Sequence, residues 1–157
     1  MDGAATDLLR RVLLASTALV AVPVIAILGA GRVGAQELIV NGSNSPYAVT
    51  SGINSFSSMN ISGTVNQSGG TLDAANASGN VYIGSNTGAG TLNLSGGTFS
   101  AGRVVIALLA NGSVNQTGGT FISTGGINIG TVASGSYTIS GAPLGEIFIW
   151  ARAAAPR

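Results

Sequence analysis

The sequence GSVNQTGGTF, residues 112–121, decides the fold, because nearly the same ten residues occur elsewhere in the chain. One copy, GTVNQSGGTL, lies at 63–72, and another, GTLNLSGGTF, lies at 90–99. A more divergent copy, GSYTISGAPL, follows at 135–144. The copies begin roughly 22 to 27 residues apart, a spacing typical of solenoid coils. We therefore expect a repeating structural unit.

Apolar and polar positions alternate within each copy. Alignment of the copies gives one column of Val65, Leu92, Val114 and Tyr137. The column two residues further on holds Gln67, Leu94, Gln116 and Ile139. Ser, Thr and Asn occupy the positions between them. This period of two predicts a strand with one buried face, in which the glutamines need partners for their amides.

A glycine pair and a second apolar element complete each repeat. The pairs Gly69-Gly70, Gly96-Gly97 and Gly118-Gly119 predict a sharp corner. The second elements are VYIG at 81–84, VVIA at 104–107, INIG at 127–130 and IFIW at 147–150. We therefore expect two strands and their turns in each unit.

One such unit is too short to bury its own apolar face, so neighbouring copies must stack. Stacking brings identical residues together, with Asn, Ser and Thr ladders outside and apolar columns in the lumen. The sequence predicts an all-β, right-handed parallel β-helix (β-solenoid) of about four coils, preceded by an N-terminal signal helix. A β-sandwich is the alternative, but it gives no reason for identical residues at identical offsets.

The N-terminal region is typical of an export signal. A basic pair, Arg10-Arg11, precedes an apolar run at 12–30 and small residues at 33–35. We expect residues 1–35 to be a signal peptide or, alternatively, a membrane anchor. Residues 36–60 are expected to form an N-terminal cap or a degenerate first coil, residues 61–150 the β-solenoid repeats, and residues 151–157 an irregular tail.

Composition restricts the chemistry available to the chain. Its 157 residues include 25 glycines but no cysteine or histidine, and only 7% are charged. The net charge of +1 offers no electrostatic footprint for nucleic acid. Without His, Cys or Lys, the familiar triads and thiolate chemistry are excluded.

The remaining charged groups do not suggest a site. Beyond the expected signal, the acids are Glu37, Asp73 and Glu146, and the bases are Arg103, Arg152 and Arg157. Asp73 and Glu146 fall three coils apart, about 14 Å at the usual strand spacing, which is too far for paired carboxylate catalysis. We predict no catalytic, cofactor-binding or metal-binding residues and no cofactor.

The quoted repeats, together with VYIGSNTGAGTLNLSGGTF at 81–99 and INIGTVASGSYTISG at 127–141, resemble the autotransporter-associated strand repeats of autotransporter passenger regions. The resemblance covers about 61–141. It implies a Gram-negative protein exported through the periplasm to the cell surface, the outer membrane or the medium. A self-exporting autotransporter ends in a membrane β-barrel, for which the residues after Gly141 leave no room.

These observations predict a non-enzymatic structural passenger, a stalk or an adhesin-like module. A fragment of a longer autotransporter and a polysaccharide-active β-helix enzyme are the alternatives. The expected partners are the export machinery at the N-terminal signal and surface glycans or like chains at the Ser/Thr/Asn face. Self-association is expected at the C-terminal coil, where 147–150 places apolar residues on a strand edge.

Overall fold

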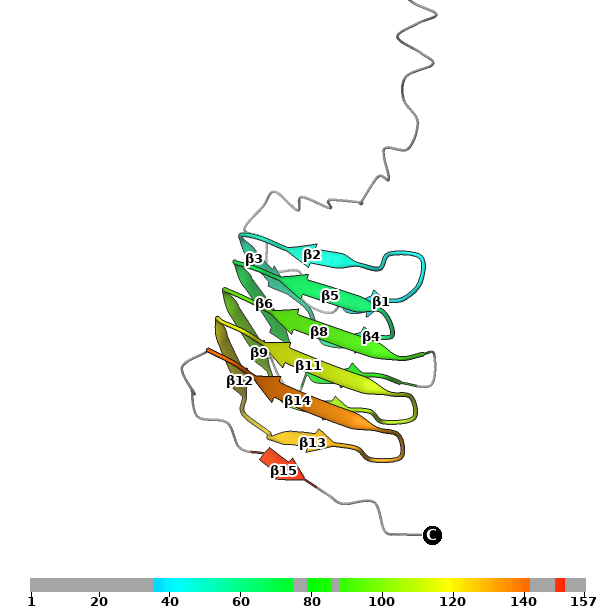
Figure 1. Ribbon diagram of the computed structural model, residues 1–157. Helices are drawn as coiled ribbons and strands as arrows, with labels where there is room; N and C mark the ends of the chain where they lie inside the picture. The colour runs from blue at the N-terminus through cyan, green and yellow to red at the C-terminus, as the bar shows by residue number, and fades with distance from the viewer. Residues whose placement is uncertain (1–35, 75–78, 86–87, 142–148, 152–157) are drawn as a thin grey trace, which may run out of the picture.

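The computed structural model describes residues 36–74, 79–85, 88–141 and 149–151 of the chain (Figure 1). The expected signal at 1–35, Glu146, and residues 152–157 of the expected tail lie outside this part. Within it every regular element is a β-strand, and no helix is present.

The described strands form three sheets, in which all neighbouring strands run parallel. Sheet A contains, in spatial order, β1 (Glu37–Val40), β4 (Ser58–Ile61), β7 (Asn80–Ile83), β10 (Arg103–Ile106), β13 (Ile127–Ile129) and β15 (Ile149–Ala151). Sheet B contains β2 (Tyr47–Val49), β5 (Thr64–Gln67), β8 (Gly90–Leu94), β11 (Gly112–Gln116) and β14 (Gly135–Ile139). Sheet C contains β3 (Ile53–Ser55), β6 (Thr71–Ala74), β9 (Thr98–Ala101) and β12 (Thr120–Ser123).

The chain visits sheets A, B and C in turn, so that each three-strand circuit is one turn of a β-solenoid. Four complete turns, β1–β3, β4–β6, β7–β9 and β10–β12, are followed by β13 and β14 of a fifth (Figure 1). The prediction of an all-β parallel solenoid of about four coils is confirmed. The expectation of two strands per repeat is wrong, because the copies at 63–72, 90–99 and 112–121 continue past their glycine corners into a separate strand of sheet C.

The segment before Ile61 supplies a full first turn. Strands β1, β2 and β3 pair with β4, β5 and β6 in the same parallel register that later turns use. None of the three contains a copy of the ten-residue repeat, so the sequence left a cap and a degenerate first coil as alternatives for residues 36–60. The first described turn therefore begins at Glu37.

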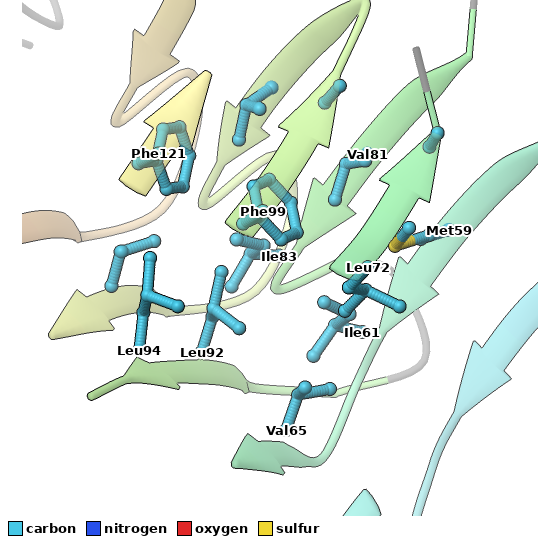
Figure 2. Packing of buried hydrophobic residues seen from close by; sticks show 14 of the residues in the cluster. Met59, Ile61, Val65, Leu72, Val81, Ile83, Leu92, Leu94, Phe99 and Phe121 are labelled. Atoms are coloured by element: carbon cyan, nitrogen blue, oxygen red, sulfur yellow. The ribbon is translucent and has the colours of Figure 1, made fainter. Parts of the chain in front are cut away.

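Apolar side chains from all three sheets fill the lumen (Figure 2). Val65, Leu92 and Val114 lie in register and are fully buried, as the repeat alignment predicts. In sheet C, the rings of Phe99 and Phe121 stack with centroids 4.7 Å apart. Burial of each such side chain stabilises the fold by about 1.5–3 kcal/mol, so the stacked turns supply the core that one turn lacks.

The glycine pair between sheets B and C is required for two separate reasons. A Cβ at Gly96 would lie 2.4 Å from the Ser68 carbonyl oxygen of the previous turn. Gly97 adopts a φ of +75°, in the left-handed region that side chains disfavour. The first glycine permits close stacking of the turns, and the second permits the predicted corner.

Candidate functional site

The charged residues in the described ranges lie on outer faces and do not form a cluster. Asp73 is on β6 of sheet C, whereas Glu37 and Arg103 are on β1 and β10 of sheet A. Glu37 and Arg103 share a column but are separated by β4 and β7, which corresponds to about 14 Å at the usual strand spacing. Within the ranges that the structure covers, no three His, Cys, Asp or Glu residues come together as a metal site.

Two buried glutamines brace the corners between sheets B and C. Gln67 and Gln116 are only 1% and 2% exposed. Each donates from Nε2 to the carbonyl of the second corner glycine, at 3.4 Å for Gly70 and 3.1 Å for Gly119. Gln67 Nε2 also lies 2.9 Å from the Thr98 carbonyl oxygen of the next turn. The Nε2 group of each glutamine therefore has the hydrogen-bond partner that a buried amide needs. Both side chains have a structural role at the corners.

The acceptor atoms of the two glutamines differ. Gln116 Oε1 accepts a hydrogen bond from the Tyr137 hydroxyl at 2.5 Å. Gln67 Oε1 is buried without a hydrogen-bond partner in the described structure. In the turn after Gln67, the position equivalent to Tyr137 is occupied by Leu92. Leucine has no hydroxyl to donate to Gln67 Oε1. Burial raises the pKa of Tyr137 from 10.0 to about 12, so this donor stays protonated to a higher pH than an exposed tyrosine.

Serine hydroxyls make hydrogen bonds at other corners, and the sequence did not predict these contacts. Ser123 is 5% exposed, and its Oγ donates to the Gly126 carbonyl at 2.8 Å. Between sheets A and B, Ser85 Oγ donates to Asn60 Oδ1 at 2.8 Å and lies 3.0 Å from Ser62 Oγ. These residues lie outside the ten-residue copies, so the repeat alignment offered no signal for them.

The outer surface of sheet B carries the most regular group of side chains. We call it the polar face and define it by the outward residues of β5, β8, β11 and β14. They are Thr64, Asn66, Thr91, Asn93, Ser113, Asn115, Ser136 and Thr138. All eight are exposed or partly exposed and uncharged. The alternation of the repeat predicted which side of each strand they occupy.

A hydrogen-bonded asparagine ladder runs along the polar face. Asn93 Nδ2 donates to Asn66 Oδ1 at 2.8 Å, and Asn115 Nδ2 donates to Asn93 Oδ1 at 2.9 Å. In the neighbouring column, the Thr91 and Ser113 hydroxyls lie 3.1 Å apart. The predicted coil-to-coil ladders are confirmed for these columns. The ladder holds exposed amides in fixed orientations on a parallel sheet.

The outer faces of the other two sheets are chemically mixed. On sheet A, Glu37 and Arg103 accompany Ile39, which is 49% exposed. On sheet C, Asp73 shares the surface with Ile53, which is 75% exposed. The polar face is therefore distinguished by its uniformity.

Comparison of the chain with protein-family models, curated proteins and solved structures gave no match. Among the residues with described structure, no helix has the length and apolar character needed to span a membrane.

Proposed function

We propose that the protein is a non-enzymatic structural module, a stalk or adhesin-like arm, that is exported to the cell surface or secreted by a Gram-negative bacterium. The observation that carries this proposal is the regular, uncharged polar face on a stacked solenoid. Its asparagine ladder repeats an identical contact from turn to turn, at 2.8 and 2.9 Å. A structural or adhesive surface uses this kind of repetition, whereas catalysis requires a few dissimilar groups brought to one point.

The solenoid architecture supports the role of a rigid spacer. Each turn contacts its neighbours through three parallel sheets, and each adds about 4.8 Å along the axis. Hydrogen-bonded side-chain columns on the polar face and packed apolar columns in the lumen resist bending of one turn relative to the next. Length and surface area then grow with the number of turns, without a change in local structure.

Assignment to the passenger regions of autotransporters rests on the residues of the repeat and on the apolar N-terminal run at 12–30. The polysaccharide-active alternative requires acids and arginines on one face. Asp73 lies on a different sheet from Arg103, and Glu37, which shares the outer face of sheet A with Arg103, is about 14 Å from it at the usual strand spacing, so the described charged residues do not cluster as that alternative requires.

Export is tested by expression of the full chain with a C-terminal epitope tag in a Gram-negative host. We expect the tag to be degraded by protease added to intact cells, or to be recovered from the medium. The matched control lacks residues 2–35 and should remain inside the cell. Retention of both forms in the cytoplasm would refute the proposal.

A further inference from the structure

We propose that the polar face of sheet B binds a neutral polysaccharide whose chain lies across several turns of the solenoid. This inference rests on the proposed structural and adhesive role and assigns it a surface and a class of partner. It is carried by three properties of the polar face, namely its lack of charge, its preorganised amides and its regular spacing.

The lack of charge determines which partners fit. From β5 to β14, every outward residue of sheet B carries a hydroxyl or an amide. Ser68, Ser95, Thr117 and Ser140 extend this surface toward the corner and are all exposed. Phosphate and carboxylate ligands are normally held by Arg or Lys, and this surface has neither. Hydroxyl groups of a sugar, which both donate and accept, match side chains that do the same.

The asparagine ladder reduces the entropic cost of binding. Asn93 both donates to Asn66 and accepts from Asn115, so its amide is already fixed along the solenoid axis. An amide has two N–H donors and two acceptor lone pairs, and the ladder uses one of each at Asn93. The remaining donor and acceptor are available to a ligand without loss of side-chain freedom on binding.

The regular spacing favours a polymer over a small sugar. Equivalent amides recur once per turn, about 4.8 Å apart along the axis. Each exposed hydrogen bond adds little net affinity because it replaces one to water. Many such contacts made by one chain add through effective concentration, which a free monosaccharide cannot use. We therefore expect retention on polymers and negligible affinity for single sugars.

The test measures retention of the full-length chain on neutral polysaccharides, with cellulose, chitin and cross-linked dextran as the probes and carboxymethylated cellulose as the charged comparison. We expect binding to at least one neutral polymer that persists at high salt, since no ion pair is involved. Glucose and N-acetylglucosamine should not compete.

A triple variant tests the ladder directly. Asn66→Ala, Asn93→Ala and Asn115→Ala together should lower the retained fraction about tenfold, as expected from loss of several weak contacts. The matched control is Thr71→Ala, Thr98→Ala and Thr120→Ala, which alters outward residues of the same three turns on sheet C. This control should bind like the unmodified chain. If the asparagine triple variant fails to fold by circular dichroism, Asn93→Ala alone should still reduce retention about threefold.

The outcomes separate this inference from the proposed function. A chain that reaches the cell surface but binds none of the neutral probes overturns the polysaccharide assignment and leaves the structural role intact. Equal binding by both triple variants overturns the assignment of the polar face. Concentration-dependent self-association that only the asparagine variants abolish, without glycan retention, would identify a second copy of the chain as the partner and overturn this inference.

Discussion

Strands β11 and β14 are adjacent copies of the same repeat, yet they differ in burial. Their residues pair in strict register from Gly112 with Gly135 to Gln116 with Ile139. In β11 the inward Val114 is fully buried, whereas the equivalent Tyr137 of β14 is half-buried. Strand β11 lies between β8 and β14, while β14 is the outermost strand described in sheet B. Burial in this solenoid thus comes from the neighbouring turns rather than from the strand itself.

In β14 a tyrosine, Tyr137, replaces the Val or Leu of the other copies, and this residue fits the edge of the sheet. Tyr137 places an aromatic ring against Phe121, with centroids 5.2 Å apart, and returns its hydroxyl to Gln116. At the opposite edge of sheet B, Tyr47 occupies the same column and is also half-buried against the core. A tyrosine covers apolar side chains with its ring while its hydroxyl reaches a polar partner.

The largest contrast is expected from a buried charge. Val114→Asp places an unpaired carboxylate in the packed lumen, so we expect loss of folding, at a cost above about 4 kcal/mol. Tyr137→Asp should give a folded but weakened protein, because its half-exposed site lets the carboxylate reach water. Asn115→Asp, on the outer face, should cost about 1 kcal/mol or less. Soluble yield and urea unfolding measure all three, and equal tolerance of the first two variants would contradict the comparison.

The glycine corners provide a second contrast. Gly97 and Gly141 have nearly the same φ, +75° and +74°. A Cβ at Gly97 would lie 2.3 Å from the Gly70 carbonyl oxygen, whereas at Gly141 the nearest atom of the described residues is the Thr117 carbonyl oxygen, 3.5 Å away. Alanine at either position should lower the free energy of unfolding, because a side chain disfavours the positive φ. Gly97→Ala should cost about 1–3 kcal/mol more, because its Cβ also collides with the previous turn. Urea midpoints that coincide for the two variants would show that the turns can separate to make room.

The sequence predicted the strands of the repeated segments better than those of the unrepeated segments. The register of sheet B could be predicted because identical residues at identical offsets fix which positions stack. The strands of sheet C were missed because only their first residues, such as Leu72 and Phe99, fall within the ten-residue copies. The first turn was predicted only as one of two alternatives, a cap or a degenerate first coil, because β1, β2 and β3 contain no copy of the repeat and form by long-range pairing with the second turn.

The candidate site was predictable to the same extent. Alternation placed Asn66, Asn93 and Asn115 on the outer face, and identical residues in one column predicted their ladder. The bracing of corners by Gln67 and Gln116 could not be predicted, because it depends on where the backbone carbonyls lie once the corner has formed. The absent hydroxyl partner of Gln67 likewise reflects Leu92 in the next turn rather than any property of Gln67 itself.

The two buried glutamines allow a finer test of the comparison. Gln67→Leu removes the Nε2 bonds to the Gly70 and Thr98 carbonyls, but it also removes a buried Oε1 that has no partner, and this relief offsets part of the loss. Leu94, the next residue in the column, shows that the site accepts leucine, so the net effect should be within about 1 kcal/mol. Gln116→Leu also removes the acceptor of the Tyr137 hydroxyl and should cost about 1–2 kcal/mol. Unfolding free energies measure the difference. A larger loss from Gln67→Leu than from Gln116→Leu would contradict the expectation that removal of the unpartnered Oε1 offsets the lost Nε2 bonds.

The smallest effect concerns pH. The pKa of Tyr137 is raised by burial from 10.0 to about 12. Between these values the unfolded chain releases a proton that the folded chain keeps, so stability is intact below pH 10 and falls as pH rises toward 12. Tyr137→Phe should lessen this alkaline loss, as followed by urea unfolding at pH 8 and at about pH 11. Tyr47, whose pKa burial also raises, remains in the variant and accounts for part of the residual slope. An unchanged slope would contradict the placement of Tyr137.

The central claim is that successive copies of the repeat lie in register in adjacent turns, and engineered disulfides test it most directly. The chain has no cysteine of its own, so introduced pairs report without interference. Asn93→Cys with Asn115→Cys joins residues that face each other in neighbouring parallel strands, at a spacing of about 4.8 Å that a disulfide can bridge. Asn66→Cys with Asn115→Cys spans two turns, about 9.6 Å, and cannot close without distortion. We predict complete intramolecular oxidation of the first pair and free thiols in the second, measured by thiol titration and intact mass. Free thiols in the first pair, or equal oxidation of both, would contradict the solenoid register.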